Sequence, residues 1–421
     1  MEHMYLRLRV AWRLHFRAAV IVFTVILTSG CSGILRVPAP VPESVHLETT
    51  VLGRNDLRIW GDEKPPDLMR EKIETALEED YAGIMHREHN YLAISGGGAN
   101  GAYGAGLLVG WSKTGTRPRF TMVTGISTGA LTAPFAFLGS AYDKQLEEVY
   151  TTMDSSSIFH RRKLWSIIGG DSLVDSSPLA RVINKYVTDE LIAEIAVEFR
   201  RGRGLFVGTT NLDAGRPVIW NIGRIADIGG PGAGDLIRSI LRASASIPGV
   251  FPPVYLEVTA PDGTTYTEMH VDGGTSSQIF LYPSRADWSG MMELLDVKGR
   301  PEAYLIRNSR ILPDYDPVSP RLTAIAGRSV DSLIRSQGIG DAYRIAAVTN
   351  RDGIDAKITW IPLSAVHESS DRYSTRCICA HCLTTVIKGR SPRIPGAIWI
   401  STILKVLKSG SHQSVNCHPE P

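Results

Sequence analysis

Short apolar runs alternate with stretches of helical periodicity along most of this chain. Grouped or alternating apolar residues predict strands at Tyr91–Ile94, from Met122 into Gly125, and at Leu205–Thr209, Tyr266–Val271, Glu302–Arg307 and Lys357–Ile361. Helical spacing is found at Leu68–Tyr81, Asp143–Lys163, Leu179–Phe199, Asp235–Ala245 and Arg321–Val348. Such strand and helix units predict an α/β fold with a mainly parallel sheet.

One turn in this pattern carries a candidate nucleophile. The stretch Met122–Leu131 (MVTGISTGAL) predicts a strand, a tight turn and a helix, with Ser127 at the turn. Gly125 and Gly129 flank the serine, and only hydrogen at these positions lets the strand and the helix pass so closely. The serine would then stand at the positive end of the following helix. An ordinary glycine-rich loop is the alternative interpretation of this pentapeptide alone.

A second glycine loop follows the strand at Tyr91–Ile94. Its sequence, Ser95–Gly106 (SGGGANGAYGAG), fits the dinucleotide pattern GxGxxG. A nucleotide fold also needs an acidic residue roughly 20 positions on, or a lysine directly after the glycines, and the chain has neither. The loop is better suited to an oxyanion hole, in which successive backbone N–H groups stabilise a negative oxygen. Parallel βα units place such a loop beside Ser127.

The strand at Tyr266–Val271 ends in Asp272-Gly273-Gly274. A carboxylate at a strand end, followed by glycines that free its backbone, is well placed to present a base to a serine. The alternative is an Asp-Gly turn that only terminates the strand. The proline-rich segment Ile247–Pro253, which precedes this strand, predicts a rigid turn lining a cleft.

Composition is that of a globular protein. The 421 residues are 43% hydrophobic and 21% charged, with a formal net charge of +2. This length allows one large or two ordinary domains. The balanced charge gives no indication of nucleic acid or of an acidic partner.

The N-terminus predicts an export signal. Four arginines precede the apolar run Ala18–Leu27, and Thr28-Ser29-Gly30-Cys31 follows it. The pattern is similar to a bacterial lipoprotein signal in which Cys31 is lipidated, although Leu27 stands one place early. An uncleaved anchor is the alternative. The proline-rich Gly33–Ser44 would serve as an extended tether.

The C-terminal part contains a cysteine cluster. Cys377, Cys379, His381 and Cys382 are too closely spaced for a usual zinc site and lack a second ligand pair; Cys417 follows. Disulfides and a tail without catalytic role are the other possibilities. His86 and His89 are expected at the surface, and no metal site is predicted.

Three segments together, GGGANG, GISTG and DGG, resemble the patatin-like phospholipase family, and RASASIPGVFPPV between the last two is also similar. The resemblance covers Tyr91 to Arg310. It implies a three-layer α/β/α fold with a mainly parallel sheet. It further implies Ser127 as nucleophile, Asp272 as base, an oxyanion loop of Gly96, Gly97 and Gly98 with Gly101, and no cofactor. Asn100 and Ser95 depart from the family, which often has a basic residue and an aspartate there.

The base that activates Ser127 is expected to be Asp272 itself. His270 lies two residues before it and would share its face of the strand, a poor position for a relay, so we expect packing or a cleft wall. A histidine triad is the competing scheme.

These features predict a lipid-anchored acyl hydrolase of the cell envelope, on the outer membrane or periplasmic side. Its substrate would be a phospholipid or another acyl lipid; neither nucleotide nor nucleic acid is expected. The alternatives are an esterase or thioesterase on non-lipid acyl groups, and a non-catalytic lipid-binding envelope protein. The expected divisions are a signal (1–31), a tether with a helical extension (32–90), the catalytic domain (91–310), its C-terminal part (311–362) and a tail (363–421).

Overall fold

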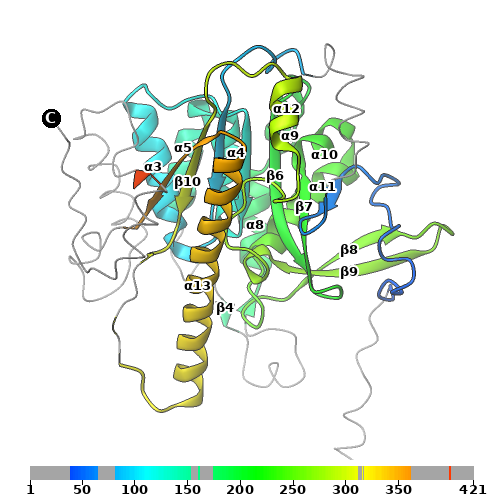
Figure 1. Cartoon of the computed structure of the whole chain (residues 1–421). Helices are drawn as coiled ribbons and strands as arrows, with labels where there is room; N and C mark the ends of the chain where they lie inside the picture. The colour runs from blue at the N-terminus through cyan, green and yellow to red at the C-terminus, as the bar shows by residue number, and fades with distance from the viewer. Residues whose placement is uncertain are drawn as a thin grey trace, which may run out of the picture.

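A ten-stranded mixed sheet organises the described part of the chain (Figure 1). The computed structural model describes residues 38–64, 81–152, 160–161, 174–311, 315, 317–361 and 398–399. The lipidation candidate Cys31, the cysteine cluster after residue 376, and all of the predicted helix at 68–81 except Tyr81 lie outside these residues.

The strands follow the spatial order β1-β7-β6-β3-β2-β10-β11-β12, with β9 also pairing with β6 and β8 with β9. Their bounds are β1 Arg58–Trp60, β2 Asn90–Ile94, β3 Met122–Ile126, β6 Gly204–Asn211, β7 Arg216–Asn221, β8 Val254–Thr259, β9 Thr265–Asp272, β10 Glu302–Arg307, β11 Asp355–Trp360 and β12 Ile398–Trp399. The central strands β6, β3, β2, β10 and β11 are parallel. A separate short pair joins β4 (His160–Arg161) to β5 (Val174–Asp175).

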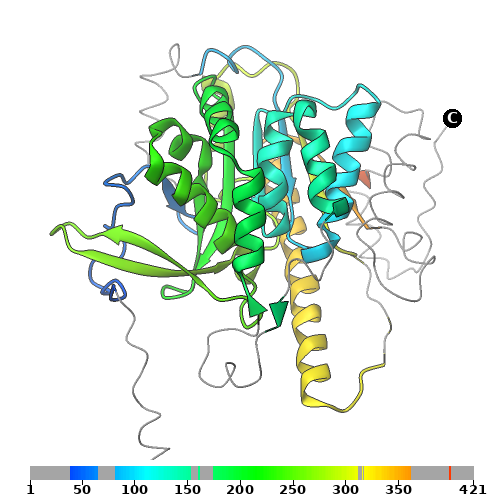
Figure 2. The same cartoon turned by 180° about the vertical axis from the view of Figure 1, so that it is seen from behind.

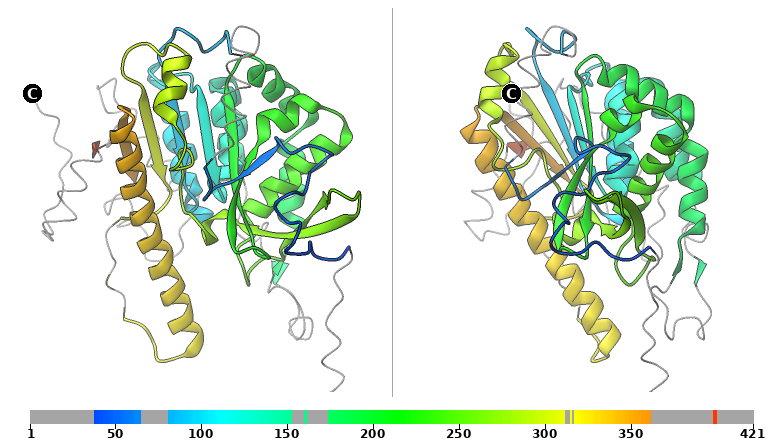
Figure 3. Two further views of the ribbon diagram at one scale, coloured as in Figure 1. Left: turned by 45° about the vertical axis from the view of Figure 1, so that its right-hand side comes forward. Right: turned by 90° about the vertical axis from the view of Figure 1, so that its right-hand side faces the viewer.

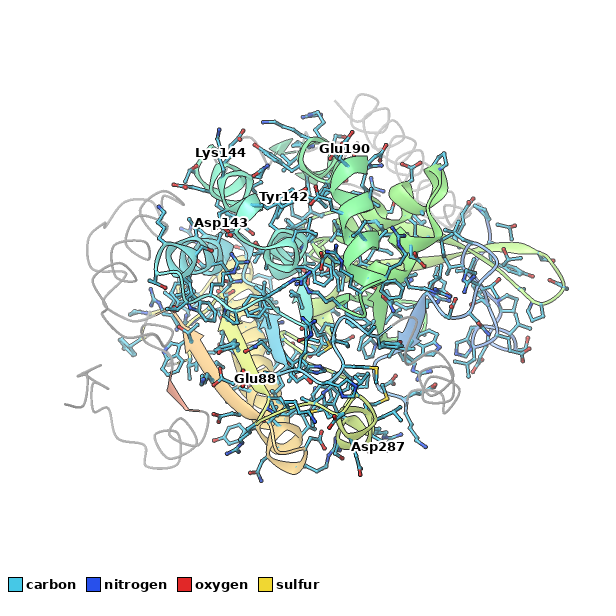
Figure 4. All side chains as sticks on the ribbon, turned by 90° about the horizontal axis from the view of Figure 1, so that it is seen from above. Glu88, Tyr142, Asp143, Lys144, Glu190 and Asp287 are labelled. Atoms are coloured by element: carbon cyan, nitrogen blue, oxygen red, sulfur yellow. The ribbon has the colours of Figure 1, made fainter. Side chains whose placement is uncertain are left out.

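Helices cover both faces of the sheet. They are α3 Gly101–Lys113, α4 Thr128–Leu138, α5 Asp143–Thr152, α8 Ser177–Tyr186, α9 Asp189–Phe199, α10 Ile222–Ile228, α11 Pro231–Ser244, α12 Trp288–Leu294 and α13 Leu322–Arg351. Helices α12 and α13 lie on one face and the others on the opposite face (Figures 1 and 2). Seen from above in Figure 4, Asp143 and Glu190 lie in one helical layer and Asp287 in the other. The fold is the predicted three-layer α/β/α arrangement.

Strand β2 explains why the central strands are continuously apolar. Leu92 and Ile94 belong to the core beneath α3 and α4, whereas Tyr91 and Ala93 pack in the second core, on the α12 and α13 side. A strand buried on both faces loses the apolar–polar alternation of a surface strand.

The structure differs from the predicted elements at three places. Thr188 interrupts the pattern predicted at 179–199, because its side chain accepts the Leu191 N–H and starts α9 as a separate helix. The helix predicted at Asp143–Lys163 ends at Thr152. Strands β1, β7 and β8 were not among the predicted elements.

The start of the described chain is docked on the sheet. Pro40 forms a bridge with Thr267 of β9, and the Thr267 N–H donates to Ala39 O at 3.0 Å. The Thr267 hydroxyl donates to Pro38 O at 2.8 Å. Part of the proline-rich segment therefore packs on β9. None of the described helices is both long and apolar enough to cross a bilayer.

Candidate active site

The turn after β3 holds Ser127 in a backbone conformation that few L-residues adopt, with φ 55° and ψ −125°. A Cβ at Gly125 would lie 2.5 Å from Gly129 O, and one at Gly129 would lie 2.2 Å from Ile94 O. Both positions therefore require glycine, for the steric reason predicted from the sequence. The Ser127 N–H donates to Ser244 Oγ at 2.9 Å, which fixes the turn against α11.

Asp272 lies directly against this serine. Ser127 Oγ donates a hydrogen bond to Asp272 Oδ2 at 2.6 Å, and the Gly274 N–H donates to Asp272 Oδ1 at 2.7 Å. The sheet produces this contact because β3 and β9 pair with the same edge of β6, β3 along residues 204–208 and β9 along residues 209–211, so the end of β3 meets the end of β9. A Cβ at Gly273 would lie 2.5 Å from Gly208 O, so glycine is required there too.

The electrostatics of Asp272 suit a base. Burial raises the pKa of its carboxyl to about 6, although the hydrogen bonds from Ser127 and the Gly274 N–H favour the ionised form. A carboxylate with a raised pKa holds a proton more readily than an exposed aspartate and is still ionised at neutral pH.

His270 points into a different set of contacts. Its Nδ1 is 2.9 Å from Thr209 Oγ1, and its Nε2 is 3.0 Å from Glu268 Oε2. The ring is fully buried and tilted against Trp220. Both ring nitrogens therefore have partners other than Ser127 and Asp272, and His270 is a packed core residue.

The glycines of the loop after β2 have different roles in the site. The Gly96 N–H donates to Gln278 O at 3.1 Å, so it is already occupied. Gly101 begins α3, where a Cβ would lie 2.0 Å from Thr128 Oγ1, so this glycine permits close packing of two helices. The N–H groups of Gly97 and Gly98 donate to no acceptor among the described residues. These two groups are the ones left to bind an oxyanion.

Asn308 was not recognised as a site residue from the sequence. It is fully buried just after β10, and its Nδ2 donates to Ser95 O at 2.9 Å while its Oδ1 accepts the Gly104 N–H at 3.0 Å. Its backbone N–H donates to Ser95 Oγ at 2.8 Å, and a Cβ at Gly97 would lie 2.2 Å from Asn308 O. Asn308 thus holds both ends of the glycine loop. The sequence contains one indication of this role: Asn308, like Asp272, stands at the end of a predicted strand.

We expect Asn308→Ala to lower kcat about 10- to 100-fold with a smaller change in KM, because the loop donors lose their position. Buried groups left without partners should also lower the free energy of unfolding by about 1–3 kcal/mol. Steady-state kinetics and urea unfolding of Asn308→Ala beside the exposed-site control Asn350→Ala test this. Equal kcat values in the two variants would show that the clamp has no effect on the site.

An apolar cavity of about 130 Å³ opens beside Ser127 and Gly98. Its walls come from α4, α5, α8 and the turn after α11, and include Leu131, Phe135, Leu179, Ile183 and Phe251. The segment Ile247–Pro253 therefore lines the cavity in part, as predicted. Aliphatic and aromatic walls next to a serine suit an acyl chain better than a charged ligand.

His89 corrects one prediction. It was expected at the surface but is buried, with Nδ1 2.9 Å from the Tyr91 hydroxyl and Nε2 2.9 Å from Ile84 O. His86 is exposed, as predicted, and pairs with Asp296. Within the described ranges, no group of three or more His, Cys, Asp or Glu side chains is arranged to hold a metal ion.

A serine on a strand–turn–helix beside a glycine loop, at one edge of a three-layer α/β/α sheet, is an arrangement found in α/β acyl hydrolases. The family model described as patatin-like phospholipase matches residues 92–283. This part of the chain belongs to the patatin-like phospholipase family, which implies lipid acyl hydrolase activity.

Other comparisons add little. The crystal structure of VipD from Legionella pneumophila is similar at 11% sequence identity, over 72% of this chain and 67% of that one, with a TM-score of 0.33. A score this low carries no argument about fold or function. A comparison with curated proteins found no match.

Proposed function

We propose that the protein is a phospholipase A or lysophospholipase that cleaves acyl esters through a dyad of Ser127 and Asp272. The observation that carries this proposal is the 2.6 Å hydrogen bond from Ser127 Oγ to Asp272 Oδ2 inside a buried site. A serine hydroxyl becomes a useful nucleophile only when an adjacent base accepts its proton.

In the first step, Ser127 Oγ attacks the ester carbonyl carbon and its proton moves to Asp272 Oδ2. The carbonyl oxygen becomes negative, and the N–H groups of Gly97 and Gly98 stabilise it, each such donor being worth about 3 kcal/mol. The tetrahedral intermediate expels the alcohol part of the lipid, which takes the proton from Asp272. Water then attacks the acyl-serine with Asp272 as base, releasing the fatty acid and restoring Ser127.

The pH profile should report the raised pKa of Asp272. Only the ionised carboxylate accepts a proton, and burial raises its pKa to about 6. We therefore expect kcat/KM to fall about tenfold per pH unit below about pH 6 and to be level above it. The measurement is kcat/KM between pH 4 and 8 on a soluble short-chain ester. A profile that stays level down to about pH 4, the ordinary value for aspartate, would contradict Asp272 as the base.

Covalent labelling tests the nucleophile and a substrate panel tests the class. A fluorophosphonate should attach to Ser127, as located by peptide mass spectrometry, and more slowly at pH 5 than at pH 7. Phospholipid, lysophospholipid, a short-chain ester and an acyl-thioester should be assayed together. Preference for the thioester would favour a thioesterase. No turnover together with retained lipid binding would favour a non-catalytic lipid-binding protein.

Lipidation at Cys31 is part of the same proposal, and it would keep the enzyme at the envelope membrane. Pro38, where the chain docks on β9, is seven residue steps from Cys31, so the tether spans at most about 25 Å. Mass spectrometry of the mature N-terminus should find a diacylglyceryl group on Cys31. An intact N-terminus or an unmodified Cys31 would contradict the anchor.

A further inference from the structure

Half of helix α13 projects beyond the other residues that the structure describes (Figures 1 and 3). Its buried residues, from Gly338 to Thr349, all lie in the C-terminal half. Arg307 Nη2 donates to Arg335 O at 3.2 Å, and Gln278 Nε2 donates to Gln337 Oε1 at 3.2 Å. Upstream of these contacts, residues 322–334 extend for about 20 Å at the rise of an α-helix.

Large apolar side chains are exposed on this projecting half. Leu322 is 84% exposed, Leu333 70%, Ile325 51% and Val330 50%. Leu322, Val330 and Leu333 share one helical face, since their spacing returns them to the same side at 3.6 residues per turn. A contiguous apolar face on a projecting helix has no role in the core of this fold and indicates a binding surface.

Basic residues lie on the remaining circumference. The segment 321–335 carries Arg321, Arg328 and Arg335 against the single acidic residue Asp331. By helical periodicity, Arg328 and Arg335 fall on the side opposite Leu322 and Leu333. An apolar face combined with arginines is the pattern of a helix that lies at an anionic bilayer surface, with the long side chains reaching the head groups.

The projecting half lies on the same side of the molecule as the candidate active site. Strands β2, β10 and β11 are parallel. The chain leaves the carboxyl end of β10, runs through α13 and enters β11 at the amino ends of these strands. Helix α13 therefore begins beyond the carboxyl ends of the strands. The Ser127 turn, the glycine loop and Asn308 all follow carboxyl ends at that same edge.

We infer that residues 322–334 of α13 dock the enzyme on an anionic lipid bilayer, with Leu322, Val330 and Leu333 entering the interface. This deepens the proposed function and rests on it for the substrate, because docking here brings the carboxyl ends of the strands, where Ser127 lies, close to the lipid. Cationic side chains near an anionic surface and buried leucines both favour the bound state.

Hydrogen exchange of the full chain measures membrane contact at residues 322–334 themselves, so binding through an anchor at the N-terminus does not mask the result. Vesicles of phosphatidylcholine containing about one third phosphatidylglycerol should slow amide exchange in residues 322–334 by at least about 10-fold. Pure phosphatidylcholine should give less protection. The double variant L322S/L333S should lose the protection. The matched control V197S/I228S, on α9 and α10 at the opposite edge of the sheet, should keep it.

Two outcomes would overturn the inference. One is exchange in residues 322–334 that vesicles do not change. The other is protection without vesicles that disappears on dilution, which would assign the face to a second copy of the chain.

Kinetics then distinguishes docking from catalysis. L322S/L333S should raise KM for vesicle phospholipid at least about 10-fold and leave kcat/KM for a soluble short-chain ester unchanged. Ser127→Ala should abolish hydrolysis of both substrates and retain the vesicle-dependent protection. Loss of the protection in L322S/L333S alone thus supports docking even if Ser127 is not the nucleophile. Equal KM values for wild type and L322S/L333S on vesicles would contradict a role for this docking in turnover.

Discussion

Replacing Asp272 with asparagine is expected to lower kcat/KM about 10³- to 10⁴-fold and to make the protein more stable at neutral pH. Asparagine can still accept the Gly274 N–H and donate to Ser127 Oγ, so the local geometry should be kept. It cannot take the proton of Ser127. Fluorophosphonate labelling of Ser127 should slow by a similar factor.

The gain in stability follows from the direction of the pKa shift. Folding raises the pKa of Asp272 from 3.8 to about 6. Between these two values the folded protein holds a proton that the unfolded chain has released, so stability falls as pH rises through this window. Above it, the buried charge lowers the free energy of unfolding by about 1–3 kcal/mol, which Asp272→Asn should recover. Urea unfolding at pH 7 and at pH 4 measures this, with the difference expected to vanish at the lower pH.

Glu268, also on β9, provides a control of opposite sign. Burial alone would raise its pKa, but hydrogen bonds from Arg58 and His270 hold the pKa below its ordinary value. Glu268→Gln should therefore destabilise the protein at pH 7 and change kcat/KM only a few-fold. If Asp272→Asn and Glu268→Gln lower activity equally, Asp272 has no special part in the reaction.

Replacing Ser127 with alanine is expected to lower activity by at least about 10⁴-fold, since among the described side chains no other hydroxyl donates to the Asp272 carboxylate; the Thr210 hydroxyl donates to the backbone carbonyl of Asp272 instead. Alanine keeps the Cβ and hence the unfavourable backbone at φ 55° and ψ −125°. Ser127→Gly should be equally inactive but more stable than Ser127→Ala by about 1 kcal/mol, because glycine adopts this conformation without strain.

The exposed Ser289 on α12 gives the matched control. Ser289→Ala should retain full activity toward phospholipid and short-chain ester, and all three variants can be compared by turnover and urea unfolding. Undiminished hydrolysis by Ser127→Ala would contradict the proposed dyad of Ser127 and Asp272. Greater stability of Ser127→Ala than of Ser127→Gly would contradict strain at the turn.

The sequence predicts those parts of the fold that are determined by residues close together in the chain. The buried strand at Tyr91–Ile94 is marked by four apolar residues, and the serine turn by two glycines whose Cβ atoms would meet backbone. The α/β/α layers are those that the family resemblance implies, and the patatin-like match from residue 92 to 283 agrees with that resemblance.

The remaining features depend on contacts between distant residues. Gly96 carries no sign in its own neighbourhood that its N–H meets Gln278 O. Asn308 escaped notice because its partner Ser95 is 213 residues away. His89 is an exception, because its partners Ile84 and Tyr91 are only five and two residues away. Its burial depends on the turn after Tyr81, which the spacing of the two histidines does not reveal.

The separation of Ser95 and Asn308 has a consequence for how the protein is made. Strand β10 enters the middle of the sheet between β2 and β11, so β2 presents an open edge until residues 302–307 leave the ribosome. At about 5–20 residues per second, the 213 residues from Ser95 to Asn308 take roughly 10–40 s to synthesise. The serine turn can form early, but the glycine loop acquires its clamp only near the end of translation. A nascent chain that stops before β10 would be an inactive species in which β2, paired with β3 on one side, has its other edge open, the kind of intermediate that chaperones bind.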